Sequence, residues 1–92
     1  MYAALVQVNI DPAQASAAAG AFSKEILPKI RAAQGFRGGY FVDPSAAGRG
    51  FGFLLFETEE MARAAVPPML PWSAPGVTIL ESDIRRVAVA LE

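Results

Sequence analysis

Several side chains in this sequence have types and positions suited to holding a small molecule. Trp72 lies in a proline-rich segment and offers a flat surface on which an aromatic ligand can stack. Tyr40 carries a hydroxyl that can orient a phenolic substrate through a hydrogen bond. Arg86 can stabilise an enolate or peroxide anion if strand alternation turns it inward. Each also has an ordinary structural explanation, as a packing residue or as a partner in a surface ion pair.

Asn9 is a further candidate because of where it falls in the first apolar segment. Residues 2–10 alternate, which predicts a strand, and one of its faces carries Gln7 and Asn9. Polar side chains on a face that points inward need hydrogen-bond partners, and a ligand can supply them. The alternative is that Asn9 only caps the turn at Asp11–Pro12.

The amino-acid composition limits the chemistry. The sequence has no cysteine and no histidine, so disulfides, thiol catalysis, the commonest general base and the commonest metal ligand are absent. No group of acidic residues has the spacing of a calcium loop. The string Gly48–Arg49–Gly50–Phe51–Gly52 falls in a predicted hairpin, where it is not a nucleotide fingerprint. We therefore predict no metal and no cofactor.

Charge and hydropathy indicate the partners. The net charge is −1 and basic residues are scattered, so we do not expect nucleic acid to bind. No apolar run approaches the roughly 18–20 residues that span a membrane, and Met1 is not followed by a basic segment. We therefore predict a cytoplasmic protein without a membrane partner. Hydrophobic residues make up 53% of only 92 residues, which favours self-association as a homodimer.

The apolar spacing divides a single domain, residues 1–92, into six main elements. The long helix has Pro28 inside it, which predicts a kink or break, and Gly35 is placed to end it. The expected elements are, in order, a strand at 2–10, a helix at 13–33, strands at 36–42 and 49–57, a helix at 58–66, a loop at 67–76, a short extended piece at 77–80 and a last strand at 85–91.

The order βαββαβ predicts an α+β, ferredoxin-like fold, with a four-stranded antiparallel sheet and both helices on one face. The strand at 49–57 is apolar on both sides, with Phe51 and Phe53 on one and Leu54 and Phe56 on the other. The helices cover only one side, so the other needs a partner. A second copy of the chain would close a dimeric α/β barrel.

The chain resembles the antibiotic biosynthesis monooxygenase-like family of dimeric α/β barrel proteins. The resemblance covers nearly all 92 residues and is carried by Leu27–Pro28, by Gly35–Phe36–Arg37–Gly38 and by the stretch FGFLLFETEE at 51–60. In heme-degrading relatives, an asparagine on the first strand, a tryptophan and an iron-ligating histidine form the site. Asn9 and Trp72 match two of these roles, but no histidine exists for the third, which argues against heme degradation here.

Two functions follow from these observations. The first, implied by the resemblance, is a cofactor-independent monooxygenase acting on a small aromatic or polyketide-like molecule. The alternative is a non-catalytic dimeric barrel that binds a small apolar ligand or serves as an assembly module. We expect any cavity between the sheet and the long helix or inside the barrel, near Asn9, Tyr40 and Trp72. Gly38 and Gly39 are expected to leave room for the ligand.

Overall fold

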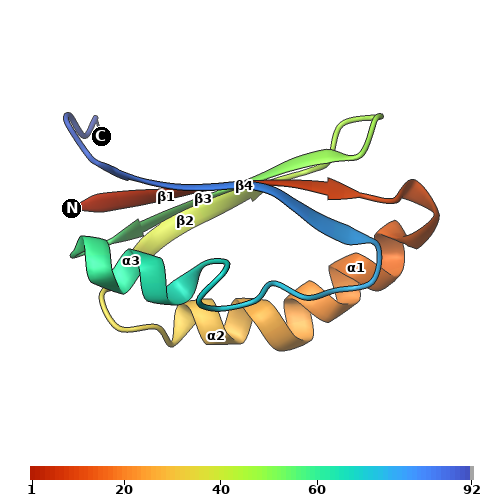
Figure 1. The fold of residues 1–92 in the computed structure, drawn as a ribbon, viewed down its shortest axis with the longest axis horizontal. Coiled ribbons are helices and arrows are strands. Elements are labelled where there is room, and N and C mark those ends of the chain that lie inside the picture. The colour runs from red at the N-terminus through yellow and green to blue at the C-terminus, as the bar shows by residue number, and fades with distance from the viewer. Residues whose placement is uncertain (92) are drawn as a thin grey trace.

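The computed structural model describes residues 1–91 and shows one antiparallel sheet with all helices on one face (Figure 1). The spatial order of the strands is β2-β3-β1-β4, and neighbouring strands are antiparallel. The predicted α+β, ferredoxin-like fold is therefore confirmed. The strands are β1 (Tyr2–Ile10), β2 (Phe36–Val42), β3 (Arg49–Phe56) and β4 (Val77–Arg86).

The predicted long helix is present but broken. Asp11 begins it, accepting a hydrogen bond at Oδ1 from the Ala13 N–H at 3.0 Å. A π-helical turn interrupts it just before Pro28, whose ring would clash with the carbonyl of Lys24 in a regular helix. Within residues 1–91, no helix is long and apolar enough to cross a membrane. The segments are η1 (Pro12–Gln14), α1 (Ala15–Ala21), η2 (Phe22–Ile26) and α2 (Leu27–Arg31).

The glycines around the start of β2 are explained by the backbone conformation and by the close approach of β3. Gly35 has a φ of 76° and Gly38 a φ of 137°, and the register of β2 against β3 shifts between Phe36 and Gly38. A Cβ on Gly39 would collide with the carbonyl oxygen of Phe53. The expectation that Gly39 leaves room for a ligand is therefore wrong, because the neighbouring strand uses that space. A Cβ on Gly38 would meet no atom within 4 Å, and the glycine there is accounted for by its φ at the bulge.

The second half of the chain folds as a short helix, a loop and one long strand. Thr58 caps α3 (Glu59–Ala65), its Oγ1 accepting from the Met61 N–H at 3.1 Å. The prediction of a last strand at 85–91 is wrong, since β4 ends at Arg86. A register shift in β4 opposite Gln7 and Val8 disturbs its alternation, which hid the strand. Residues 87–91 do alternate, but they have no strand to pair with. β1 begins at Tyr2, and Tyr2 already pairs with Arg86.

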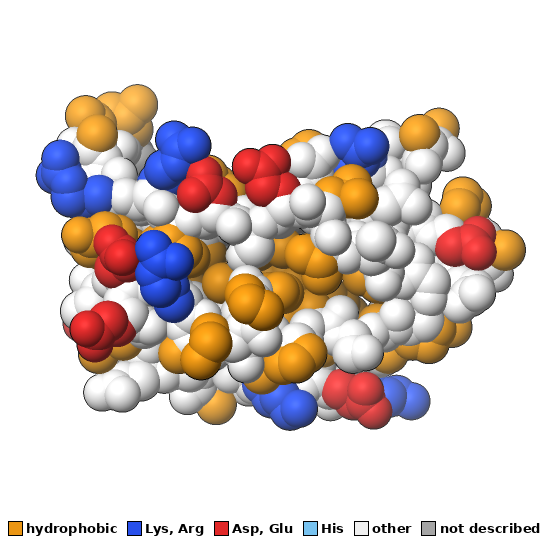
Figure 2. Space-filling view, viewed as in Figure 1, with side chains coloured by type: hydrophobic (Ala, Val, Ile, Leu, Met, Phe, Trp, Pro, Cys, Tyr) orange, Lys and Arg blue, Asp and Glu red, His pale blue; other side chains and the backbone are white. Residues whose placement is uncertain are grey.

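The hydrophobic core lies between the sheet and the helices. Ala4 and Val6 of β1, with Leu54 and Phe56 of β3, point into it, and Ile26 and Ile30 of the long helical segment close it. Seen from the side, hydrophobic side chains gather between the sheet and the helical layer, while charged ones lie around the margin (Figure 2).

The other face of the sheet has no covering element in the part of the chain that the structure describes. We call it the open face. Strand pairing places Leu5, Tyr40 and Phe53 side by side on it, and Phe51 lies one step further along β3. Their exposed fractions are 37%, 75%, 40% and 50%. The prediction that β3 is apolar on both sides is confirmed.

Candidate functional site

A cavity of about 400 Å³ lies between the sheet and the α1–η2 segment. Its sheet side is formed by β1, β2 and β3, and its helix side by α1 and η2, with Trp72 of the loop before β4 between them. We call it the aromatic cavity because Phe22, Phe41 and Trp72 line it. It is the first of the two positions expected from the sequence, between the sheet and the long helix.

The floor of the aromatic cavity exists because β3 carries glycine at two positions that face the helices. Gly50 and Gly52 are both buried and alternate with Phe51 and Phe53, which face the opposite way. A Cβ on Gly50 would lie 3.3 Å from Cγ2 of Val8, whereas one on Gly52 would lie 2.8 Å from Cε1 of Phe41. The missing side chain at Gly52 therefore makes room for the Phe41 ring that lines the cavity, and the one at Gly50 leaves the neighbouring floor low.

Three aromatic rings form one wall of the cavity. The ring centroids of Phe22 and Phe41 are 5.1 Å apart, and those of Phe22 and Trp72 are 5.6 Å apart, both in edge-to-face geometry. Trp72 is only 2% exposed, and its Nε1–H donates to the carbonyl of Ala65 at 3.2 Å. The indole is therefore held in place from behind, while its ring borders the cavity.

The helix side of the cavity is built from small side chains and the π-helical turn. Ala15, Ala18 and Ala19 of α1 line it, so the helix leaves the space unfilled. Phe22 and Ser23, which also line it, belong to η2. Such turns occur frequently at functional sites, because the extra residue re-aims the side chains that follow.

Polar groups occur only at the margin of the aromatic cavity, as far as residues 1–91 are concerned. Ser23 and Asp43 supply the polar side chains of the lining, and both are exposed. Gly50, Gly52 and Trp72 deeper in the lining are buried. The cavity therefore offers an apolar interior with one hydroxyl and one carboxylate where it meets solvent.

The structure does not bring the predicted site residues together. Trp72 lies on the helix-covered face and packs as the predicted hydrophobic plug of its loop. Asn9 and Tyr40 lie on the open face, where Asn9 pairs with Arg49 near one end of β1 and Tyr40 pairs with Phe53. The expectation that Asn9, Tyr40 and Trp72 border one cavity is therefore wrong, since the sheet separates the first two from the third.

Arg86 is also remote from the aromatic cavity. It lies opposite Tyr2, at the other end of β1 from Asn9. Alternation turns its neighbour Arg85 to the open face, where Arg85 Nε donates to Asp83 Oδ2 at 2.7 Å. A surface ion pair was the alternative predicted for Arg85 and Arg86. The structure contains such a pair at Arg85.

A signal for the cavity was present in the sequence. The stretch Gly50–Phe51–Gly52–Phe53 alternates small and large residues with the period of a strand. In a strand covered by helices on one side, that pattern puts both glycines on the same face and removes the side chains there. The glycine string therefore marks the part of β3 that lines the aromatic cavity.

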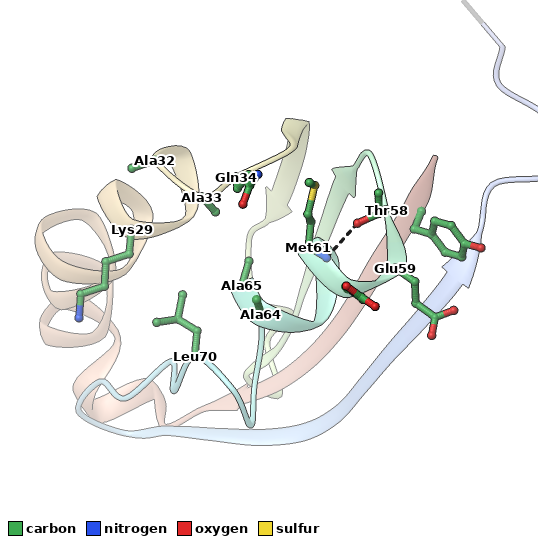
Figure 3. A pocket seen from close by; sticks show the side chains of 12 residues that line it. Lys29, Ala32, Ala33, Gln34, Thr58, Glu59, Met61, Ala64, Ala65 and Leu70 are labelled. Atoms are coloured by element: carbon green, nitrogen blue, oxygen red, sulfur yellow. Dashed lines mark hydrogen bonds between the residues drawn. The ribbon is translucent and has the colours of Figure 1, made fainter.

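A second, larger groove runs between α2 and α3 (Figure 3). It has a volume of about 1160 Å³ and is more open to solvent than the aromatic cavity. Lys29 lies on one side and Glu59 on the other, and Glu59 already pairs with Arg63 at 3.1 Å. Met61 in its lining packs against Gly35. The groove is a surface feature whose lining mixes small apolar side chains with polar ones such as Gln34 and Glu60.

No three acidic side chains of residues 1–91 lie close enough to form a metal site. The prediction that the protein binds no metal stays a prediction.

Comparison with known proteins defines the class of fold. No family model and no curated protein sequence matches the chain. A solved structure does match: an arginine-to-serine mutant of MhuD with two manganese protoporphyrin IX molecules bound per active site. The match covers 100% of this chain and 99% of that chain, with a TM-score of 0.65 and 16% sequence identity.

The chain is thus an α+β protein with a ferredoxin-like fold, and the whole of it superposes on the solved structure. More particularly, it has the fold of MhuD, and the resemblance to antibiotic biosynthesis monooxygenase-like proteins is confirmed at the level of the fold.

The aromatic cavity does not suit an iron porphyrin. Among residues 1–91, no histidine, cysteine, methionine or tyrosine lines it to serve as an axial ligand. Asp43 is the only charged side chain of residues 1–91 in the lining, so nothing there would neutralise the porphyrin propionates. The cavity suits an uncharged ring better than a dianionic macrocycle.

Proposed function

We propose that this protein binds a small, flat aromatic or polyketide-like molecule in the aromatic cavity and oxidises it as a cofactor-independent monooxygenase. The observation that carries the proposal is the apolar cavity of about 400 Å³ that Phe22, Phe41 and Trp72 line. The reaction class rests on the fold shared with MhuD and on the family resemblance of the sequence.

The size and lining of the cavity support a ligand of this kind. Ligand pockets typically measure about 300–1,000 Å³ and are mainly apolar with a few polar groups. The aromatic cavity, at about 400 Å³, is at the small end of that range. Phe22, Phe41 and Trp72 offer ring faces and edges to a bound ring, and burying a ring there removes apolar surface from water.

The proposed reaction needs little from the protein. A phenolic substrate loses its hydroxyl proton, and the electron-rich ring carbon transfers electrons to molecular oxygen and forms a hydroperoxide. Loss of water then leaves a quinone, so the substrate loses two hydrogens and gains one oxygen, and the second oxygen leaves as water. In this chain, Asp43 accepts the phenolic proton at the cavity margin, and the apolar interior keeps water from the ring.

Binding is tested by filling the cavity from its helix side. Ala19→Leu places three extra carbons in the lining, whereas Ala17→Leu makes the same change on an exposed site of the same helix that does not line the cavity. We expect naphthalene to shift the fluorescence of Trp72 saturably in the parent. Affinity falls about tenfold or more in Ala19→Leu and is unchanged in Ala17→Leu. Equal affinities in both variants would place the ligand elsewhere.

Oxygenation is tested separately with an oxygen electrode and a panel of fused-ring phenols. We expect one molecule of oxygen consumed per molecule of quinone formed, without added metal, and loss of this activity in Ala19→Leu. Saturable binding with no oxygen uptake for any phenol would make the protein a non-catalytic binder instead, the alternative predicted from the sequence.

We also propose that two copies pair through their open faces and enclose a barrel. Leu5, Phe51 and Phe53 leave apolar surface exposed at the centre of that face, which a small monomer seldom does. A stable interface buries on the order of 1,600 Å² in total.

Sedimentation tests the homodimer directly. We expect a dimer at micromolar concentration and a monomer for Phe53→Asp, because the substitution puts two facing carboxylates near the two-fold axis. Met69→Asp is the matched control, since Met69 is 72% exposed but lies in the loop between α3 and β4. A monomeric parent protein would refute the proposed dimer.

A further inference from the structure

We infer from the margin of the aromatic cavity that its ligand carries a hydrogen-bond donor, a hydroxyl or an amino group, and that arylcarboxylates are rejected. This inference rests on the proposed function and names the substrate class of the same site. It depends on two residues that the sequence did not single out, Ser23 and Asp43.

Asp43 has an uncommitted carboxylate. Within residues 1–91 it makes no hydrogen bond and no ion pair, although several other acidic side chains in this small domain do. Asp11 caps the first helical turn, Glu57 pairs with Arg37, and Asp83 pairs with Arg85. Asp43 is therefore available to accept a hydrogen bond from a ligand in the cavity that it lines.

The backbone holds Asp43 at the cavity. It follows Val42, the last residue of β2, and Pro44 comes next. The residue before a proline is restricted to extended backbone, so Asp43 continues the extended course of β2 before the hairpin loop bends away from the helices (Figure 1). Val42 and Pro44 line the cavity as well, which fixes the whole end of β2 along its margin.

Ser23 supplies a second polar group from the helix side. It belongs to η2, lines the cavity and is exposed, and its hydroxyl makes no hydrogen bond to any described residue. A hydroxyl both donates and accepts, whereas an ionised carboxylate only accepts. A phenolic ligand can donate to Asp43 and accept from Ser23, with its rings directed toward Trp72.

Charge discriminates against an anionic ligand. No cation among residues 1–91 lines the cavity, so an arylcarboxylate would face Asp43 without compensation. Because Asp43 is exposed, solvent screens the repulsion. Two unit charges about 4 Å apart in water change affinity by about fivefold. The cavity therefore prefers neutral or cationic donors by a measurable but modest factor.

The experiment compares a naphthol, naphthalene and the corresponding naphthoate by following the Trp72 indole N–H in NMR titrations. We expect the parent to bind the naphthol most tightly and the naphthoate most weakly. Asp43→Asn keeps the shape and removes the charge, so the ratio of naphthol to naphthoate affinity falls about fivefold or more. Naphthalene affinity stays the same. Glu60→Gln, which removes a carboxylate that lines the other groove, leaves all three affinities unchanged.

Two outcomes would overturn the inference in distinguishable ways. If naphthalene binds but Asp43→Asn leaves the ratio of naphthol to naphthoate affinity unchanged, the inference about Asp43 is wrong and the aromatic cavity survives. If none of the three compounds binds the parent protein, the proposed function is wrong, and the inference about Asp43 fails with it.

Discussion

The two faces of the sheet are both apolar, but they differ in the size of the side chains that β3 presents on them. On the helix-covered face, β3 presents Gly50 and Gly52 at one end and Leu54 and Phe56 at the other. On the open face the same strand presents large side chains, among them Phe51 and Phe53. One strand therefore gives a packed core, a hollow and an exposed aromatic surface.

The difference teaches that side-chain volume decides where a small ligand is held. The covered face has helices over it, so where β3 carries glycine a cavity remains between the two layers, with its inner part buried and its margin open to solvent. The open face has larger side chains but no layer to enclose a small molecule within one chain. An apolar surface of this kind suits a macromolecular partner.

The largest difference between the two faces is expected in stability. Phe56 is 0% exposed, so Phe56→Ala loses buried surface and leaves a cavity, with an expected cost of about 3–5 kcal/mol. Phe53→Ala removes the same ring from the open face and is expected to cost less than half of that at low protein concentration. Urea unfolding of both variants measures the difference. Equal losses would mean that the two faces are equally packed.

A smaller effect is expected where the covered face is anchored to its loop. Trp72→Phe keeps an aromatic ring but leaves the buried carbonyl of Ala65 without the indole donor. An unsatisfied buried group costs about 1–3 kcal/mol, and thermal unfolding should show this loss. A variant as stable as the parent would show that the loop does not depend on this hydrogen bond.

The helical layer itself depends on a cap. In Thr58→Ala the Met61 N–H at the start of α3 loses its acceptor, at a cost of about 1 kcal/mol. Thr58→Ser retains the hydroxyl and serves as the control, with no loss expected, because serine is at least as good an N-cap as threonine. Urea midpoints compare the two. A serine variant as destabilised as the alanine variant would assign the loss to the methyl group instead.

The smallest effect is expected from the ion pair on the open face. Arg85 and Asp83 are 2.7 Å apart, but their side chains are 72% and 34% exposed. Exposed pairs of this kind contribute about 0–1 kcal/mol, so Arg85→Ala should change the unfolding free energy of the monomer by no more than that. A loss above about 2 kcal/mol would indicate that this end of the open face is buried in solution.

The sequence predicted the fold well because strand and helix periodicities and their capping residues are local. The Thr58 cap and the break near Pro28 lie where the sequence places them. Gly35 has the expected left-handed conformation, but the helix already ends at Arg31, before the predicted residue 33. The last strand was misplaced because its extent depends on β1, far away in the chain. Neither the bulge opposite Gln7 nor the end of pairing at Tyr2 can be inferred from residues 77–91 alone.

The candidate site was predicted less well, for a related reason. Trp72 lines a cavity between the sheet and the helix, but Asn9 and Tyr40, which were expected near it, do not. Which face of the sheet a side chain occupies depends on register, and register assigns both to the open face. Asp43 and Ser23 gave no local signal, because only tertiary structure brings the end of β2 to the π-helical turn.

The most direct test of the account is a crystal structure of the protein grown with a naphthol. We expect ring density in the aromatic cavity of each protomer, beside Phe22 and Trp72, with the hydroxyl directed toward Asp43. Ring density between the open faces of two protomers, or none in the aromatic cavity at saturating ligand, would contradict the claim that the covered face holds the ligand.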